Sequence, residues 1–259
     1  MPDFITDAIL LRKIEYGDHD FIISFLTESK GKISVIAKNA KKSVKRFSGA
    51  LDLFFDNHIQ CTFPKKNKDG LIILSQAQIK NGFTNIRYDV FKTAYASFWV
   101  ELIHFWLEED KTQSDLYDLL LFSLDALNTG LISKKVLNLI FQIRFMSISG
   151  FSPNIENCDI CKTSVDSIEQ KNIRFDFKEG RIICQNCAEQ RSKYGMMISK
   201  GTLKQLFWIN NADINRADRI RFSGFAIEEG TRLLEAFIPF HIGKDFKSLR
   251  FLKQIRSKR

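Results

Sequence analysis

The chain has 259 residues, of which 44% are apolar or aromatic and 27% are charged, with only 4 prolines and 13 glycines. These values exclude a collagen-like, low-complexity or intrinsically unfolded chain, and the length allows roughly one to three domains. Lysine and arginine number 39 against 30 acidic residues, and the net charge of +9 favours an anionic partner such as nucleic acid or anionic lipid.

No segment predicts a membrane span or a secretory leader. The longest nearly uninterrupted apolar run, residues 94–107, contains Glu101 and His104 and is shorter than the ~20 residues that a span needs. The N-terminal residues include Asp3 and Asp7 and have no cationic stretch before an apolar one, which is atypical of a signal peptide. We therefore expect a protein of the reducing cytoplasm with no membrane partner.

The first eighty or so residues predict β-structure. Apolar runs separated by turn-forming residues cover 4–14, 21–26, 33–37, 51–63 and 71–79. Five short strands without helical patterns between them favour a small closed or nearly closed barrel. The stretch 38–48 has almost no apolar residue to bury, so we expect it to be a loop that joins the third and fourth strands.

After Phe83 the apolar residues recur at steps of three and four. This spacing predicts amphipathic helices within 91–106, 116–127 and 136–146, and Ser133 and Gly150 are placed to begin and end the third. Similar patterns cover 203–210, 226–238 and 246–255. The expected architecture is therefore a multidomain α+β chain, in which an N-terminal β-barrel is followed by a helical bundle.

Two C-x2-C pairs, Cys158/Cys161 and Cys184/Cys187, are separated by 22 residues. Each pair can present two sulfurs to one ion from a tight turn, and the two pairs together complete the tetrahedron that zinc prefers. Because four protein ligands leave no position for water, we expect one structural Zn²⁺ in an inserted zinc-ribbon-like region. The segment 162–183 is long enough for a hairpin, and Gly180 offers its turn.

The alternatives to a metal site are disulfides, a redox-active pair or simply buried thiols. Disulfides conflict with a reducing compartment, and a redox pair needs no second copy.

The positive charge is local. Residues 30–46 contain seven basic residues and no acid, and residues 241–259 contain seven more against Asp245 alone. Such density attracts phosphodiesters, although a solvated face or a frayed tail is the alternative in each case. We expect Phe47 either to stack on a base or to cover the barrel end. The candidate nucleic-acid-binding residues are Lys32, Lys38, Lys41, Lys42, Lys45, Arg46, Phe47, Lys65 and Lys66.

No catalytic motif is present. The chain lacks the common phosphate-binding loops, the nucleophile elbow and the zinc-protease helix motif, and its four histidines are isolated along the sequence. We predict no catalytic residue and no enzyme. A metal-dependent DNA-processing enzyme such as a nuclease, with carboxylates from distant segments, and an RNA-binding zinc-ribbon module of the translation apparatus are the alternatives.

The run Gly31–Lys38 (GKISVIAK) resembles a segment that marks the bacterial recombination mediator RecO family. Further similar positions are Ala8–Leu11, Tyr16–Gly17, Asp20, Phe25–Thr27, Lys41–Lys42, Arg46–Phe47, Gly49–Leu51 and Gly150–Pro153, the last leading into Cys158 and Cys161. Asn39 is a departure, because relatives usually carry glycine there. Asparagine tolerates a positive φ better than most residues, so we expect the loop conformation to be kept. Only part of the family has the metal-ligand cysteines, and this chain has all four.

The resemblance implies an OB-fold barrel at residues 1–82, a helical domain formed by 83–150 and 196–259, and a zinc-binding region at 151–195. It also implies a bacterial, cytoplasmic mediator of the RecF pathway, associated with the nucleoid during repair. Such proteins bind single- and double-stranded DNA and anneal complementary strands. With the partner RecR they help to load RecA on strands coated by single-stranded DNA-binding protein, whose C-terminal tail they contact. The basic tail at 241–259 is expected to bind DNA, to receive that tail or to remain in solvent.

Overall fold

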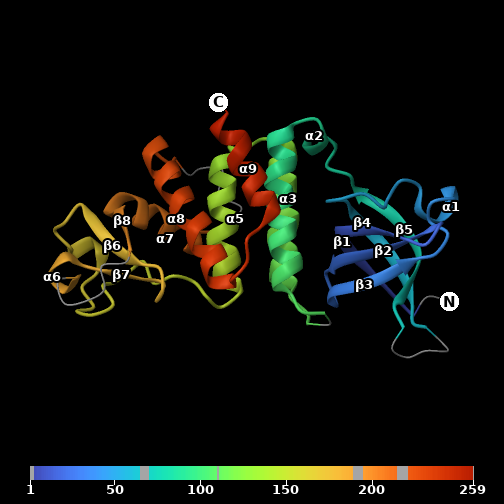
Figure 1. Cartoon of the computed structure of the whole chain (residues 1–259), viewed down its shortest axis with the longest axis horizontal. Coiled ribbons are helices and arrows are strands. Elements are labelled where there is room, and N and C mark those ends of the chain that lie inside the picture. Colours follow the sequence, from blue (N-terminus) through green and yellow to red (C-terminus); the bar gives the residue numbers. More distant parts are fainter. Residues whose placement is uncertain (1–2, 65–69, 110, 189–194, 215–220, 259) are drawn as a thin grey trace. The chain divides into compact units, whose positions relative to one another are not determined.

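A computed structural model describes residues 3–64, 70–109, 111–188, 195–214 and 221–258 (Figure 1). The chain divides into two compact units, one formed by residues 1–129 and 250–259 and the other by residues 130–249. The predicted α+β class is confirmed, since the first unit contains a closed barrel and the second combines helices with a small sheet. Lys65 and Lys66, two candidate site residues, lie outside the described residues.

The first unit begins with the predicted five-stranded barrel. Its strands are β1 (Phe4–Tyr16), β2 (Asp20–Thr27), β3 (Gly31–Ala37), β4 (Asp56–Thr62) and β5 (Ile72–Asn81). They close in the order β1-β2-β3-β5-β4, with β1 paired to β4 and a short parallel pairing between β3 and β5. Closure pairs the strand edges, which would otherwise invite association with other chains.

The connection between β3 and β4 contributes to the barrel core. Phe47, Ala50 and Leu51 are buried together with core residues such as Phe25 and Val35. A short helix, α1 (Val44–Phe47), lies within the predicted loop, and β4 begins at Asp56 rather than at residue 51. One helical turn is too short to produce a recognisable apolar period, which is why the sequence pattern missed it.

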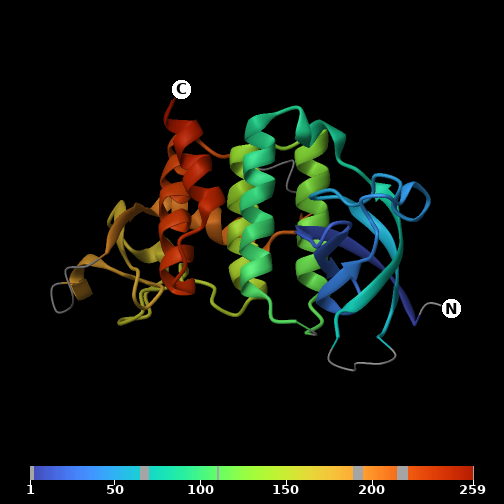
Figure 2. The ribbon, with the colours of Figure 1, turned by 45° about the vertical axis from the view of Figure 1, so that its right-hand side comes forward.

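Two helices cover part of the barrel's outer surface. Helix α3 (Val90–Trp106) packs against β1 and α4 (Ser114–Thr129) packs against β2, and a short helix, α2 (Thr84–Arg87), precedes them. The two longer helices lie beside the blue barrel in Figure 2. Outward-pointing residues of the two strands, such as Ile9 and Leu26, are consequently buried. This covering explains why both faces of β1 and β2 are apolar where the strands pass beneath the helices.

The second unit is built around three helices that pack on one another: α5 (Lys134–Ile148), α7 (Lys200–Asn211) and α8 (Gly224–Ile242). Ser133 caps α5 as predicted, since its hydroxyl accepts a hydrogen bond from the Val136 amide. The last helix, α9 (Lys247–Ser257), also matches the predicted pattern, and its residues from Arg250 onward are assigned to the first unit. None of the described helices combines the length and hydropathy that crossing a bilayer requires.

Side chains from neighbouring helices hold both ends of α7. The buried Glu229 of α8 accepts hydrogen bonds from the amide and the hydroxyl of Ser199, the N-cap of α7, at 3.0 and 2.6 Å. At the other end, Arg144 of α5 donates from Nε to the carbonyl of Ile209 at 3.0 Å. Backbone groups that a helix leaves unpaired at its ends are thereby satisfied.

A small sheet completes the second unit. Its strands are β6 (Asn172–Asp176), β7 (Arg181–Ile183) and β8 (Met196–Ser199), in the order β7-β6-β8. The antiparallel pairing of β6 with β7 is the hairpin that the sequence predicted, and Gly180 lies in its turn with φ +64°. This hairpin leads directly into the second cysteine pair.

Candidate nucleic-acid interface and metal centre

The loop at residues 38–46, called here the cationic loop, is fixed against the turn between β1 and β2. The Asn39 amide donates to Asp20 Oδ1 at 2.7 Å, and the Lys41 amide donates to the His19 carbonyl at 3.1 Å. Asn39 adopts φ 53°, which confirms the expectation that this position needs a positive φ. The loop is therefore held in place by hydrogen bonds of its backbone amides.

The cationic loop contains five of the predicted binding residues, in two different situations. The side chains of Lys38, Lys42 and Lys45 are exposed, and no described carboxylate forms an ion pair with any of the three. Lys41 instead donates to Glu15 Oε2 at 2.7 Å, and Arg46 donates to the Lys38 carbonyl at 2.5 Å. The three exposed lysines therefore carry charges that could contact phosphates, whereas Lys41 and Arg46 form contacts that hold the loop in its conformation.

Two predicted residues do not lie on this surface. Phe47 is 3% exposed and packs in the barrel core, so of its two expected roles the structure supports covering the barrel and not stacking on a base. Lys32 lies at the opposite end of β3, six residues and about 20 Å from Lys38. Its ammonium donates to the His104 carbonyl at 3.0 Å, and burial lowers its pKa.

The sequence reading missed an aromatic and cationic cluster beside the loop. The ammonium groups of Lys13 and Lys41 lie 5.2 and 5.7 Å from the ring centroid of Phe21. Lys13 also donates to the Leu51 carbonyl at 2.7 Å. The sequence signal for this cluster was the pair of basic residues Arg12-Lys13 near the end of the first strand, which was interpreted only as part of the strand.

The start of β3 is closed off by the connection between α3 and α4. Ser34 donates to Glu109 and Thr112 donates to the Ser29 carbonyl, so part of the β2–β3 face is occupied. OB-type barrels commonly bind ligands on that face and on adjoining loops. The cationic loop lies at the other end of β3, away from this connection.

Gly31 makes this closure sterically possible. It has φ +67°, and a Cβ built on it would lie 1.9 Å from the carbonyl oxygen of Lys111. We predict that Gly31→Ala lowers the free energy of unfolding by at least about 2 kcal/mol, because left-handed strain and displacement of the loop add together. Gly17→Ala is the matched control, with φ +55° and nothing within 4 Å. Equal melting temperatures for the two variants would contradict this role of Gly31.

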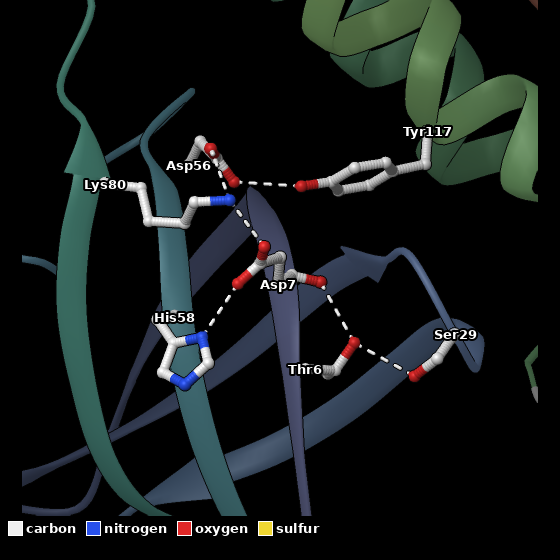
Figure 3. Close-up of polar contacts among 7 residues, drawn as sticks. All are labelled: Thr6, Asp7, Ser29, Asp56, His58, Lys80 and Tyr117. Atoms are coloured by element: carbon white, nitrogen blue, oxygen red, sulfur yellow. Dashed lines mark hydrogen bonds and ion pairs between the residues drawn. The ribbon is translucent and has the colours of Figure 1, made fainter.

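A polar network joins three strands of the barrel to α4. Figure 3 shows Asp7 between His58 and Lys80, and Asp56 facing Tyr117. His58 Nδ1 lies 2.8 Å from Asp7 Oδ1, Lys80 donates to Asp7, and the Tyr117 hydroxyl donates to Asp56 Oδ1 at 3.0 Å. Burial raises the pKa of Asp56. Burial also tends to raise the pKa of Asp7, but the hydrogen bonds from Lys80 and His58 outweigh it and hold that pKa below its usual value.

The lowered pKa of Asp7 predicts a loss of stability in acid. A carboxylate whose pKa is depressed by folding stabilises the folded state above its unfolded pKa, near 3.9, and loses that contribution as the pH falls through the folded pKa. At pH 7, Asp7→Asn is expected to cost about 1 kcal/mol, and the difference from the unmodified protein should be smaller at acidic pH. Asp18→Asn, in an exposed turn, is the control. Denaturant titrations at both pH values check the result, which a pH-independent difference would refute.

The four predicted cysteines come together in the second unit. The sulfurs of Cys158, Cys161, Cys184 and Cys187 all lie within 4.8 Å of one another. The Cys161–Cys184 sulfur distance is 3.7 Å, close to the ~3.8 Å edge of a tetrahedron with metal–sulfur bonds of about 2.3 Å, and far from the ~2.05 Å of a disulfide. The cysteines are free thiols in a geometry that can hold a metal ion.

Backbone turns create this geometry. In the first knuckle the Lys162 amide donates to the Cys158 carbonyl at 2.9 Å, and Lys162 adopts φ 59°. In the second, which starts the short helix α6 (Gln185–Ala188), the Cys187 amide donates to the Cys184 carbonyl at 3.1 Å. Each turn presents two sulfurs on one side, as the spacing predicted.

Neighbouring groups hold the first knuckle against the sheet. Asp159 pairs with Arg181 of β7 at 2.7 Å, and its amide donates to the Ile182 carbonyl at 2.9 Å. Hydrogen bonds with Thr163 lower the pKa of Cys161 to about 6, which favours the thiolate that metals bind. Among the residues the structure describes, no other group of three or more histidine, cysteine or acidic side chains is arranged to hold a metal ion.

Comparisons with known proteins cover the whole chain. The family model "Recombination protein O N terminal" matches residues 1–83, and "Recombination protein O C terminal" matches residues 87–250. The chain is 42% identical over 256 residues to a DNA repair protein RecO of Desulfatibacillum aliphaticivorans, with 99% of this chain and 98% of the relative covered. It is 38% identical over 259 residues to a DNA repair protein RecO of Desulfosudis oleivorans, with 99% of each chain covered.

Proposed function

The chain belongs to the recombination protein O family and is a DNA repair and recombination protein. From this premise we propose that residues 1–82 bind single- and double-stranded DNA through the cationic loop. The observation that carries the proposal is the exposure of Lys38, Lys42 and Lys45 on a loop whose backbone is fixed to the β1–β2 turn. Contacts of this kind neutralise phosphates and carry no base code, so binding has little sequence preference and strong salt sensitivity.

Annealing follows from the same contacts. When one protein neutralises phosphates of two strands, their mutual repulsion falls and their local concentration rises, so base pairing proceeds without bond chemistry supplied by the protein. We therefore propose a mediator and not an enzyme. The nuclease alternative differs in predicting shortened strands in the presence of a divalent metal, and an RNA-binding module differs in preferring strands with 2′-hydroxyl groups.

Family membership supports three further partners for this protein. The proposed role is to act with RecR on strands coated by single-stranded DNA-binding protein and so to assist RecA loading. The C-terminal tail of the coating protein is the proposed contact. Basic residues of α9, including the exposed Lys253, offer one surface for either that acidic tail or DNA.

For the metal centre we propose one structural Zn²⁺ held by Cys158, Cys161, Cys184 and Cys187. Four thiolates suit zinc, and with all four positions filled by protein the ion has no open site for substrate. When bound, the ion supplies a crosslink between the two knuckles, and its binding free energy contributes to folding of this region.

A strand-annealing assay tests the proposed function. Complementary oligonucleotides coated with single-stranded DNA-binding protein are mixed with the purified protein, with and without RecR, and duplex formation and strand length are followed. We expect faster annealing with the protein than without it, a change in the annealing rate when RecR is added, and strands of unchanged length. Annealing no faster than in the protein-free control, or shortened strands, would refute the mediator role.

A further inference from the structure

A row of four isoleucines crosses the outer surface of the barrel. Ile14 of β1 is paired with Ile22 of β2, Ile22 with Ile36 of β3, and Ile36 with Ile73 of β5. Paired residues point to the same face of a sheet, and the neighbouring Ile23 and Val35 point into the core, so the row points outward. At a strand spacing of about 4.8 Å the row is about 14 Å long. We call Ile14, Ile22, Ile36 and Ile73 the isoleucine row.

The isoleucine row is partly exposed to solvent. Ile14 is 41% exposed, and Tyr16, on the same face two residues further along β1, is 54% exposed. The other three isoleucines are half-buried. Other outward apolar residues of β1, such as Ile9, are buried at 0% exposure, in the part of the strand that the helices cover. Single exposed apolar residues are ordinary, but a continuous row on four strands with an aromatic ring beside it indicates a contact surface.

Cations lie at both sides of this surface. Arg12 precedes Ile14 on the same face of β1, and Lys38 follows Ile36 by two residues where the cationic loop begins. An apolar strip bordered by positive charge matches a single strand of nucleic acid, whose phosphates are anionic and whose bases have apolar faces. A duplex keeps those base faces stacked in its interior, so it can use the cations but not the isoleucine row.

We propose that the isoleucine row and Tyr16 form a base-contact surface for unpaired nucleotides, so that this end of the barrel binds single strands more tightly than duplex. The inference rests on the proposed DNA-binding function and defines its substrate class. The cationic loop supplies affinity for any phosphate chain. The isoleucine row and Tyr16 supply the discrimination between unpaired and paired strands.

Equilibrium binding of the full-length protein to a deoxythymidine oligonucleotide and to a duplex of equal length tests the proposal. The variant combines Ile14→Ser with Tyr16→Ser. The matched control combines Ile5→Ser with Ile79→Ser, which removes two side chains of similar exposure, 49% and 41%, outside the row. The loss of one base–aromatic stack typically lowers affinity about 5- to 150-fold. We expect a loss in that range for the single strand, an almost unchanged duplex affinity, and an unchanged salt dependence.

The outcomes distinguish failure of the proposed DNA-binding function from failure of the proposed base-contact surface. If the unmodified protein binds neither ligand, the proposed DNA-binding function fails. If it binds both ligands and the variant loses no affinity, the base-contact surface is refuted. The same holds if the variant loses affinity for single strand and duplex equally while the control variant does not.

A Tyr16→Trp variant provides a second test in a protein of unaltered fold. Its added fluorescence should be quenched by the single strand and not by the duplex, and equal quenching by both would overturn the proposal.

Discussion

Replacing Cys158 and Cys184 by serine is expected to abolish metal binding and to unfold the region between residues 151 and 195. Each substitution removes one thiolate from a different knuckle, so neither C-x2-C pair keeps both sulfurs. Structural zinc contributes about 10–16 kcal/mol in small zinc-finger peptides, and the three-stranded sheet beside the cysteines has few residues with which to replace that contribution. The loss should therefore exceed the effect of any single core substitution.

Metal analysis and thermal unfolding of the purified protein measure this effect. The unmodified protein should contain one zinc ion per chain, and the double variant none, with an early unfolding transition. Cys61→Ala is the control. Its thiol is buried in the barrel, where burial raises its pKa to about 12, and its removal should leave the metal content at one. A double variant with stoichiometric metal and an unchanged melting temperature would contradict the metal centre.

Replacing Lys38, Lys42 and Lys45 together by alanine is expected to lower DNA affinity about 50- to 150-fold at 0.15 M salt. Each neutralised phosphate contributes about 0.7 to 0.9 to the slope of log affinity against log salt, so loss of three contacts should reduce that slope by about 2 to 3. Lys41 and Arg46 are expected to contribute less, because they already have partners within the barrel and loop.

The control for this experiment removes the same charge elsewhere. Lys135, Lys171 and Lys178 are exposed lysines of the second unit, and their combined replacement by alanine lowers the net charge equally. Its salt slope should match that of the unmodified protein. If the two triple variants behave alike, affinity depends on net charge and not on the cationic loop.

Much of the fold could be predicted because its signals are local. Apolar runs between turn residues predicted the barrel strands, and steps of three and four predicted α3, α4 and α5. The pairing of β1 with β4 and the parallel contact of β3 with β5 have no local signature, because register is set by tertiary packing. One signal in β1 and β2 was overlooked. Apolar residues occupy consecutive positions there, such as Leu10 and Leu11, and this pattern indicates that helices cover the outer face of the strands.

The candidate site was predictable in type but not in detail. The cysteine spacing predicted which sulfurs meet, since each knuckle is a local turn. The basic run indicated an anionic ligand, but not that Lys32 would turn toward His104, nor that Phe47 would be buried. The polar network between Asp7 and Lys80 joins residues far apart in the chain, so no spacing rule could have found it.

The most direct test of the account is the salt dependence of binding to single-stranded oligonucleotides of unrelated sequence. We predict that the logarithm of affinity falls linearly with the logarithm of salt concentration, with the same slope for every sequence, and that all strands are recovered at full length. An absence of binding in dilute buffer, an affinity that follows base sequence instead of salt, or cleaved strands would contradict binding through phosphate contacts.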